Sequence, residues 1–349
     1  TNAGEYAYLN PNYTFISFTN VTSSGVLSIF AGNGTAGTPV AGPAISSPLA
    51  VAKGVAVDSL GNVYIADLMN YVVEKISPAG ILSVFAGNGT QGTPVSGTAI
   101  NSPLGSLNGV AVDSSGNVYI ADITNNVIEK VTSTGVLSIF AGNGTAGTPV
   151  AGPAISSPLN SPQGVAVDSS GNVYIADNGN NVIEKVTAAG ALSIFAGNGT
   201  QSTPIAGAAT SSPLSSPAGI AADSSGNVYI ADAGNNVVEK VSPSGVLSIF
   251  AGNGTQSAPI AGPATSSPLS SPQGVAVDSS GNVYIADYNN NLVEKVTAAG
   301  VLSIFAGNGI TGAPIAGPAT DSPIKPFGVA VGSGNVYIAD GPYVVKVMQ

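Results

Sequence analysis

A repeat of 55 residues constrains this chain more than any other feature. The stretch Ala-Gly-Asn-Gly begins at Ala31 and returns every 55 residues as far as Ala306. Asn-Val-Tyr-Ile-Ala-Asp begins at Asn62 and recurs with the same spacing, except that its last copy, at Asn335, comes two residues early. Both stretches occur six times, and self-similarity at such a period indicates one structural unit per copy. We therefore expect six equivalent units.

Each repeat contains four short segments with the character of β-strands. In the third repeat they are Gly164–Asp168, Asn172–Asp177, Val182–Thr187 and Ala191–Ala196. Gly, Asn, Asp and Pro separate the segments, and the second segment alternates as a strand does. Helical periodicity is absent, and a β-helix would use shorter repeats. Four strands per repeat predict an all-β, six-bladed β-propeller of four-stranded blades.

The two ends of the repeat region indicate how the ring closes. The chain opens with a single fourth-strand segment at Val26–Ala31. It finishes with first, second and third strands at Gly328–Gly332, Asn335–Asp340 and Tyr343–Val347, without a fourth. Joining the ends completes the sixth blade and covers exposed strand edges. We expect residues 25–349 to form one propeller domain, preceded by an extension at residues 1–24.

The composition excludes several classes of function. Charged residues form 7% of the chain, where roughly 25% is typical, and the net charge is −10. All eight basic residues are lysines, so the clustered cations that nucleic-acid binding needs are missing. Cys and His are absent, which removes thiol nucleophiles, Ser-His dyads and ordinary zinc or copper sites. We expect no cofactor and no nucleic-acid partner.

Two further features concern the compartment. No apolar run approaches the ~18 residues of a membrane span, so we expect no transmembrane segment. The chain begins at Thr1 without a methionine, which fits a cleaved signal peptide or a trimmed chain. A surface rich in Ser, Thr and Asn with little charge suits an exported protein. The expected location is extracellular or at the cell surface.

The repeat resembles a known family. The residues from Ser161 to Asp168, followed by Asn-Val-Tyr-Ile-Ala-Asp and the segment to Val186, look like the NHL repeat in its bacterial secreted form. The resemblance covers about residues 25–349 and implies a six-bladed propeller. RNA-binding relatives use basic surfaces, and the peptide-amidating lyase branch uses histidine-bound metal, so neither activity is implied here. Val182 and Glu184 stand where bacterial relatives commonly carry Arg.

Two sets of aspartates end strands in the repeats. The first set, whose sixth place is taken by Gly332, comprises Asp58, Asp113, Asp168, Asp223 and Asp278. The second set comprises Asp67, Asp122, Asp177, Asp232, Asp287 and Asp340. A ring of carboxylates could hold Ca²⁺, but aspartate also caps turns, and an active site would normally break the symmetry. We prefer the turn-forming role for both sets and assign no catalytic or metal-binding residue.

Glu-Lys pairs occupy the third strands of five repeats, at Glu74, Glu129, Glu184, Glu239 and Glu294 and the lysine after each. Adjacent residues on a strand face opposite ways, so the two members of a pair should not touch. We expect them to form ladders with neighbouring strands or to keep strand edges soluble.

Five Asn-Gly-Thr sequences are formal N-glycosylation acceptors, at Asn33, Asn88, Asn143, Asn198 and Asn253. Asn-Gly is also a turn signal, and we favour that structural use over modification. The sixth copy, at Asn308, lacks the threonine.

A long loop such as Thr145–Pro162 joins successive repeats. Its Pro, Gly, Ala and Ser content favours polyproline-like paths over further strands, and six copies should pave one face of the disc. We expect its apolar residues Pro149, Val150, Ala151 and Ile155 to pack back on the propeller, with a stacking surface as the alternative.

The segment Thr1–Ser24 has no place in the six blades. A strand-like stretch, Tyr13–Val21, ends it, and its candidate partner-binding residues are Tyr6, Tyr8, Tyr13, Phe15, Ile16 and Phe18. Such a strand could fold back as a cover strand or pair with an edge of another molecule and build filaments. Both options remain open.

The leading functional hypothesis is a non-catalytic, extracellular structural or adhesive scaffold that self-assembles through Thr1–Ser24. Its expected partners are copies of itself, surface proteins or glycans. The alternative is a propeller that captures a glycan or peptide on one face, for which repeated pockets are expected. A third hypothesis, a lactonase- or lyase-like enzyme, would need an asymmetric acid/base or metal cluster.

Overall fold

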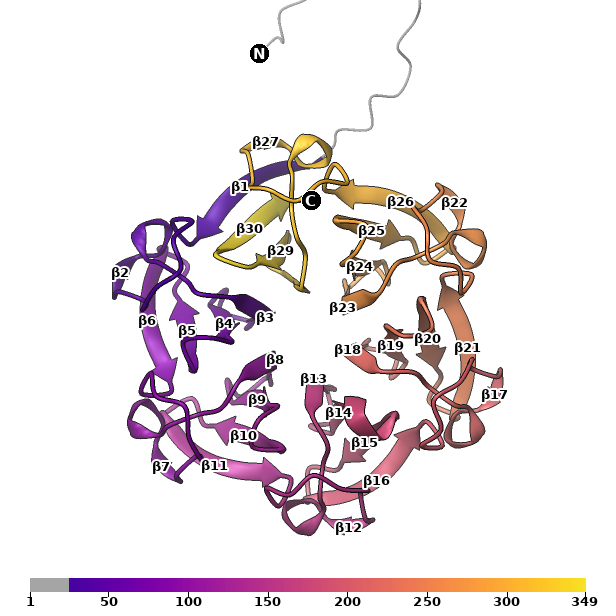
Figure 1. The fold of residues 1–349 in the computed structure, drawn as a ribbon, viewed down its shortest axis with the longest axis horizontal. Coiled ribbons are helices and arrows are strands. Elements are labelled where there is room, and N and C mark those ends of the chain that lie inside the picture. The colour runs from indigo at the N-terminus through magenta and orange to yellow at the C-terminus, as the bar shows by residue number, and fades with distance from the viewer. Residues whose placement is uncertain (1–24) are drawn as a thin grey trace, which may run out of the picture.

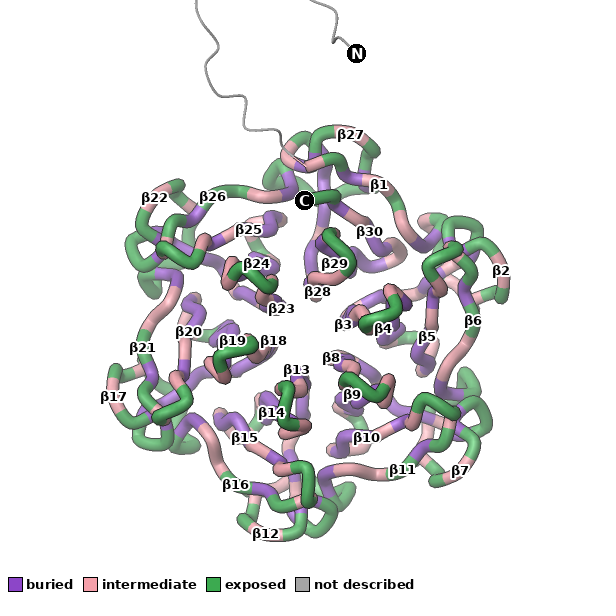
Figure 2. The backbone as a smooth tube through the Cα atoms, turned by 180° about the vertical axis from the view of Figure 1, so that it is seen from behind, coloured by how far each residue is buried: buried purple, intermediate pink, exposed green. Residues whose placement is uncertain are grey.

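The computed structural model describes residues 25–349, and they form a ring of six blades around a central channel (Figure 1). This confirms the predicted six-bladed β-propeller. Each blade is an antiparallel sheet whose first strand lines the channel and whose fourth strand lies at the outside. Buried residues fill the space between the blades, while turns and outer loops are exposed (Figure 2).

The strands of the first three blades repeat one order. Blade 1 contains β2 (Gly42–Pro43), β3 (Ala52–Val57), β4 (Val63–Asp67), β5 (Val72–Ile76) and β6 (Ile81–Ala86). Blade 2 contains β7 (Gly97–Thr98), β8 (Leu107–Val112), β9 (Val118–Asp122), β10 (Val127–Val131) and β11 (Val136–Ala141). Blade 3 contains β12 (Gly152–Pro153), β13 (Pro162–Val167), β14 (Val173–Asp177), β15 (Val182–Val186) and β16 (Ala191–Ala196).

The other three blades follow the same order. Blade 4 contains β17 (Gly207–Ala208), β18 (Pro217–Ala222), β19 (Val228–Asp232), β20 (Val237–Val241) and β21 (Val246–Ala251). Blade 5 contains β22 (Gly262–Pro263), β23 (Pro272–Val277), β24 (Val283–Asp287), β25 (Leu292–Val296) and β26 (Val301–Ala306). Blade 6 contains β27 (Gly317–Pro318), β28 (Gly328–Gly332), β29 (Asn335–Asp340), β30 (Tyr343–Met348) and β1 (Val26–Ala31).

Short 3₁₀ turns are the only helices in this part of the chain. Each long loop holds one, at Ala44–Ser46, Ala99–Asn101, Ala154–Ser156, Ala209–Ser211, Ala264–Ser266 and Ala319–Asp321, and one more lies at Asn178–Asn180. No helix within residues 25–349 is long and apolar enough to cross a membrane.

The ring closes as predicted. Strand β1 pairs antiparallel with β30, with Leu27 opposite Val347 and Ile29 opposite Val345, so the first strand completes the last blade. Leu27 is fully buried in the core that blade 6 shares with blade 5. Closure therefore joins two segments that lie at opposite ends of the repeat region.

The blades have five strands rather than the four expected. The fifth is a two-residue segment of the long loop, such as β2, which pairs with the outer strand β6 through Gly42 opposite Leu82 and Pro43 opposite Ile81. Proline has no N–H to donate, and an edge position does not require one. The loop satisfies backbone groups of the outer strand that would otherwise form an open edge.

The long loops run along the rim rather than paving one face, contrary to the expectation. The loop before β3 runs along the outer side of its blade as far as the β5–β6 turn, where the Ala44 N–H donates to the Gly80 carbonyl at 2.9 Å. The loop then turns back to β3. We call the face that carries the turns between second and third strands, such as β4–β5, the loop face. The opposite face, which carries the β3–β4 and β5–β6 turns, is the hairpin face.

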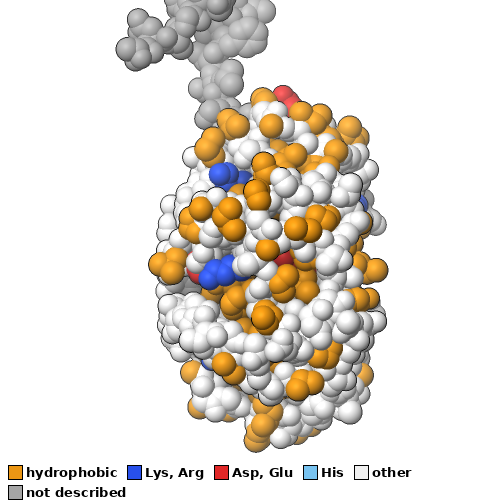
Figure 3. All heavy atoms as spheres, turned by 90° about the vertical axis from the view of Figure 1, so that its left-hand side faces the viewer, with side chains coloured by type: hydrophobic (Ala, Val, Ile, Leu, Met, Phe, Trp, Pro, Cys, Tyr) orange, Lys and Arg blue, Asp and Glu red, His pale blue; other side chains and the backbone are white. Residues whose placement is uncertain are grey.

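The apolar loop residues also differ from the expectation, because they do not pack back. Val150 is 62% exposed and Ile155 is 60% exposed. Together with their equivalents they form a rim belt of exposed aliphatic side chains, namely Val40, Ile45, Val95, Ile100, Val150, Ile155, Ile205, Ile260 and Ile315. Seen edge-on, the molecule carries apolar side chains across the rim with few charges among them (Figure 3).

Candidate functional site

The first set of aspartates caps turns on the hairpin face, as preferred from the sequence. In blade 3 Asp168 accepts hydrogen bonds from the backbone N–H groups of Ser170 and Asn172, both at 2.9 Å, and from the hydroxyl of Tyr174 at 3.1 Å. Burial alone would raise the pKa of Asp168, but these hydrogen bonds bring the pKa below its ordinary value. Within residues 25–349 no three acidic side chains lie close enough to hold a metal ion. The hydrogen bonds give this first set of aspartates a structural role in the turns.

The second set does more than form turns, because each aspartate clamps distant segments on the loop face. In blade 3 Asp177 accepts from the Asn160 N–H at 3.0 Å and from the Asn180 amide at 2.7 Å. The same amide also donates to the carbonyl of Gly147 in the long loop at 2.7 Å. The clamp thus fixes the long loop, the β14–β15 turn and the start of β13, which together border the sites described below.

The third-strand glutamates are buried, contrary to the expectation that they keep edges soluble. Glu184 is fully buried, and neither carboxylate oxygen has a hydrogen-bond donor among the described residues. The third strand is not an edge, because it lies between two others and its glutamate faces the preceding blade. Lys185 points to the opposite side, over the Tyr174 ring at 5.4 Å. The two residues thus face apart, as predicted.

Each buried glutamate lies beside an aspartate of the second set. Glu184 and Asp177 are diagonal neighbours on one face of the β14–β15 pair. Burial raises the pKa of Glu184 well above its ordinary value, and the adjacent Asp177 raises it further. Protonated Glu184 can donate to the Asp177 carboxylate, which resolves the lack of any other donor. Blade 6 lacks this pair, because Val345 takes the place of the glutamate beside Asp340.

The Asn-Gly-Thr sequences form turns on the loop face. In blade 3 Asn198 accepts from the backbone N–H of Thr200 at 3.0 Å and from its hydroxyl at 2.6 Å, and donates to the Ser211 carbonyl at 3.0 Å. The same bonds recur at Asn33, Asn88, Asn143 and Asn253. The structural use is therefore present, and N-glycosylation stays a prediction.

A pocket lies beside each of two such turns, at equivalent places in blades 1 and 3. The blade 1 pocket has a volume of about 300 Å³ and is lined by Thr38, Pro39, Asn70, Val72, Val84, Gly87, Asn88, Gly89 and Ile100. The blade 3 pocket has a volume of about 450 Å³ and is lined by Thr148, Pro149, Gly179, Asn180, Val182, Ile194, Gly197, Asn198, Gly199 and Thr210. Nine of these positions correspond at a spacing of 110 residues, twice the repeat length. We call them rim pockets.

The rim pockets combine hydroxyl and amide groups with aliphatic walls. The residues that line them carry no charge. Two exchanges put smaller side chains at the blade 3 pocket, where Thr210 stands at the position of Ile100 in blade 1 and Gly179 at the position of Met69. Both volumes lie in the range of small-molecule sites, about 300–1,000 Å³.

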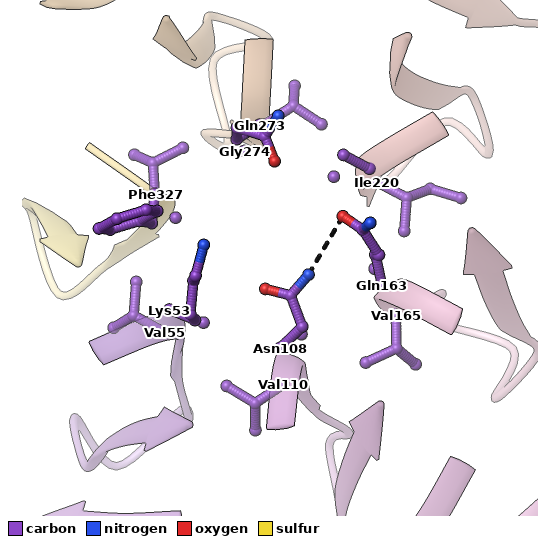
Figure 4. A pocket seen from close by; sticks show the side chains of 18 residues that line it. Lys53, Val55, Asn108, Val110, Gln163, Val165, Ile220, Gln273, Gly274 and Phe327 are labelled. Atoms are coloured by element: carbon purple, nitrogen blue, oxygen red, sulfur yellow. Dashed lines mark hydrogen bonds between the residues drawn. The ribbon is translucent and has the colours of Figure 1, made fainter. Parts of the chain in front are cut away.

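The central channel opens on the loop face through a ring of six residues of five different types. Each precedes a glycine of the innermost strand, and in blade order they are Lys53, Asn108, Gln163, Ala218, Gln273 and Phe327. Several point into the channel, and the Asn108 amide donates to Gln163 Oε1 at 3.2 Å (Figure 4). The cavity is narrow, about 70 Å³. We call this ring the channel mouth.

The candidate partner-binding residues Tyr6, Tyr8, Tyr13, Phe15, Ile16 and Phe18 lie outside the described residues. Sequence reasoning missed the rim pockets and the channel mouth. The pockets arise from segments brought together by the Asp–Asn clamps, which no single stretch reveals. The channel mouth had a visible signal, because its six residues are of five different types while the following glycine is present in every repeat.

We compared the sequence and the fold with those of known proteins. The NHL repeat model matches residues 159–184, 214–239 and 269–295. No match was found among curated protein sequences. The fold and surface define a six-bladed β-propeller with pockets on one face. Three of its repeats match the NHL repeat, as the resemblance indicated.

Several solved structures share the fold. An auxiliary nutrient binding protein from Bacteroides thetaiotaomicron has a TM-score of 0.68 at 13% identity, covering 92% of this chain and 76% of that one. Virginiamycin B lyase from Staphylococcus aureus has a TM-score of 0.57 at 13% identity, over 93% and 99% of the two chains. A gluconolactonase from Xanthomonas campestris has a TM-score of 0.59 at 13% identity, over 93% and 91%. Binding proteins and enzymes both use this fold, so function rests on the site.

Proposed function

We propose that this chain is a non-catalytic binding propeller that captures neutral, hydroxyl-rich ligands, glycans above all, in its rim pockets. The observation that carries the proposal is the recurrence of one pocket at equivalent residues of blades 1 and 3. The same kind of site is therefore present at two places in the described residues. The alternative hypothesis from the sequence, a propeller that captures a glycan or peptide, predicted such repeated pockets.

The chemistry of the lining favours a neutral ligand with both polar and apolar faces. Thr148 and Asn180 offer a hydroxyl and an amide, and Ile194 and Val182 offer aliphatic surface. A sugar ring presents hydroxyl groups at its edge and C–H groups on its faces, which matches this combination. A charged ligand would lose hydration without gaining an ion pair.

Repeated pockets strengthen binding to a surface that displays many copies of a ligand. Once one pocket is occupied, the next binding event is intramolecular, and avidity can exceed a single affinity by about 10²–10⁴. This suits the extracellular or cell-surface location that we propose from the weakly charged, Ser- and Thr-rich composition.

A non-catalytic role is supported by where the acidic groups lie. Asp168 and its equivalents cap turns, and Glu184 and its equivalents are buried between blades. The described residues that line the rim pockets offer neither an acid/base pair nor a charged group. A general acid or base needs to reach the substrate.

The test uses substitutions that already occur between equivalent positions of different blades. We expect labelled protein to bind neutral oligosaccharides on a glycan array. The triple variant Thr210→Ile, Thr265→Ile and Thr320→Ile installs the isoleucine found at Ile45, Ile100 and Ile155. It narrows the blade 3 pocket at Thr210 and makes the same exchange at the two equivalent positions. We expect its apparent affinity to fall at least about tenfold, since the wider of the two rim pockets is narrowed and binding through both pockets is weakened.

The matched control places three aliphatic residues on the hairpin face. Ser170→Leu, Ser225→Leu and Ser280→Leu copy Leu60, which is 78% exposed at the equivalent turn of blade 1. This variant should bind like the unmodified protein. Equal binding by the threonine variant, or the absence of any glycan binding, would reject the proposal. A glycan attached at Asn198 would cover the same pocket, so mass spectrometry of that peptide must accompany the array.

A second candidate function is self-association as a structural or adhesive scaffold. The rim belt supports it, because Val150, Ile205 and their equivalents expose aliphatic surface around the whole disc. Light scattering and electron microscopy of the full chain test this candidate. Filaments or a lattice that are lost on replacing the six residues at the Val150 position with serine would support it, and a monomer at all concentrations would reject it.

A further inference from the structure

The channel mouth breaks the symmetry of the repeat. At the ring position the six blades carry one lysine, one asparagine, two glutamines, one alanine and one phenylalanine. The next residue is glycine in all six, because the innermost strands approach too closely for a side chain there. A Cβ on Gly164, for example, would overlap the carbonyl oxygen of Ala218. The fold therefore dictates the glycine but not the residue before it.

Lys53 is the one titratable residue among those that line the channel. Its ammonium stands over the Phe327 ring, 3.8 Å from the centroid. No described residue accepts a hydrogen bond from it. The side chain is half-buried and points into the channel from β3, next to Asn108 (Figure 4). A cation held at a narrow opening with free donors is a binding feature for an anion.

Amide groups complete the polar part of the ring. Asn108, Gln163 and Gln273 come from β8, β13 and β23 and surround an opening free of acidic residues. The Asn108 amide donates to Gln163 Oε1 at 3.2 Å, and the Gln273 amide donates to Ser271 Oγ at 3.1 Å. Phe327 adds an apolar wall beside Lys53. On the opposite side of the ring Ala218, three blades away, has only a methyl group and leaves room. The mouth thus offers one cation, neutral amide side chains and apolar surface.

The volume limits what can enter. About 70 Å³ holds a few water molecules, far below the 300 Å³ or so at which small-molecule pockets begin. A whole ligand cannot enter, but a single small group can. We propose that the channel mouth binds a carboxylate at the Lys53 ammonium, while the rest of the ligand lies over Phe327 and Ala218. This site is separate from the rim pockets.

Calorimetric titration of the full chain with propionate, benzoate and trialanine tests the site. The trialanine arm distinguishes a peptide C-terminus from a small organic acid as the source of the carboxylate. We expect at least one of the three carboxylates to bind with a Kd of about 1 mM or tighter. The corresponding amides, including propionamide and trialanine amide, should bind at least about tenfold more weakly, since they carry no charge.

Lys53→Gln is the decisive variant, because blades 3 and 5 carry glutamine at this position and the fold accepts it. It should weaken carboxylate binding at least about tenfold. Lys325→Gln is the matched control, since Lys325 donates to the Tyr288 carbonyl at 3.0 Å and does not line the channel. A melting curve for each variant establishes folding. Unchanged binding by Lys53→Gln, equal loss in both variants, or no carboxylate binding would overturn the proposal.

The pH supplies a second readout. Burial lowers the pKa of Lys53 to about 8. The residues that face it from β8, β13, β18, β23 and β28 are amides, glycines and apolar residues, and none of them titrates. Carboxylate affinity should therefore fall as the pH rises from 7 to 9. An affinity that stays constant over this range contradicts a role for the Lys53 ammonium.

Discussion

At the scale of single residues, the buried glutamates are the most unusual feature of the ring. Each of five blades holds one at zero exposure, paired only with an aspartate that is itself buried. An unpartnered buried carboxylate destabilises a fold, so the protonated form is preferred. Val345 shows that the same place in blade 6 accepts an apolar residue. The five carboxyl pairs are thus not required for blade packing.

Stability should depend on pH through these glutamates. The pKa of Glu184 is raised in the folded state, so the folded protein binds the proton more tightly than the unfolded chain. Tighter proton binding by Glu184 in the folded state stabilises the fold. This contribution is fully present below the ordinary pKa of glutamate and is lost as the pH rises towards the raised pKa. We expect the free energy of unfolding, measured with urea, to fall between pH 5 and pH 8.

Replacing Glu184 by valine should remove part of this dependence. Glu184→Val copies Val345 and is expected to raise the free energy of unfolding at pH 8 by about 1–3 kcal/mol. The reciprocal change Val345→Glu places a carboxyl beside Asp340, whose pKa burial already raises to about 6. It should lower stability at pH 8 more than at pH 5. If Glu184→Val lowered the free energy of unfolding at pH 8, or Val345→Glu raised it, the buried carboxyl would not be the cause of the pH dependence.

At the scale of elements, the innermost strands determine the width of the channel. Their glycines have no room for a Cβ, as at Gly164, whereas turn glycines such as Gly190 have open space but a φ of +83°. A substitution at the first kind of position meets neighbouring backbone. At the second kind it meets only conformational strain, which costs about 1 kcal/mol.

These two glycines make a direct comparison. We predict that Gly164→Ala lowers the free energy of unfolding by about 3 kcal/mol or more, because β13 must move away from β18. Gly190→Ala should lower it by only about 1 kcal/mol. Urea unfolding of both variants measures the difference. Equal losses would mean that the inner strands can separate freely.

The sequence predicted the main strands well and the shorter elements poorly. Second strands such as Val173–Asp177 show a period of two and are bounded by turn residues, so their place was evident. Strand β12 has two residues, too few for any period, and it forms because the outer strand offers an edge. The burial of Glu184 was missed because its strand looks amphipathic until the neighbouring blade is placed against it.

At the scale of the whole molecule, the ring depends on the pairing of β1 with β30. Leu27 and Ala31 of β1 are both fully buried, each in a different core between blades. Removing the strand would open both cores and expose the edge of β30. The order of the strand segments at the two ends of the chain predicted this closure. The rim pockets and the channel mouth depend on contacts between distant segments, so the order of segments along the chain could not predict them.

Deletion of Val26–Ala31 should therefore lower the melting temperature by about 10 °C or more. The comparison is with the same chain beginning at Gly25, followed by circular dichroism on heating. A melting temperature that stays the same after deletion would contradict closure by β1.

The most direct test of the binding function is to count ligands on the intact chain. Native mass spectrometry with the oligosaccharide that binds best on the array can resolve each added copy. We predict more than one bound copy per chain, and fewer copies for the Thr210→Ile, Thr265→Ile and Thr320→Ile variant. A single bound copy that the variant retains, or no bound copy at all, would contradict ligand capture by repeated rim pockets.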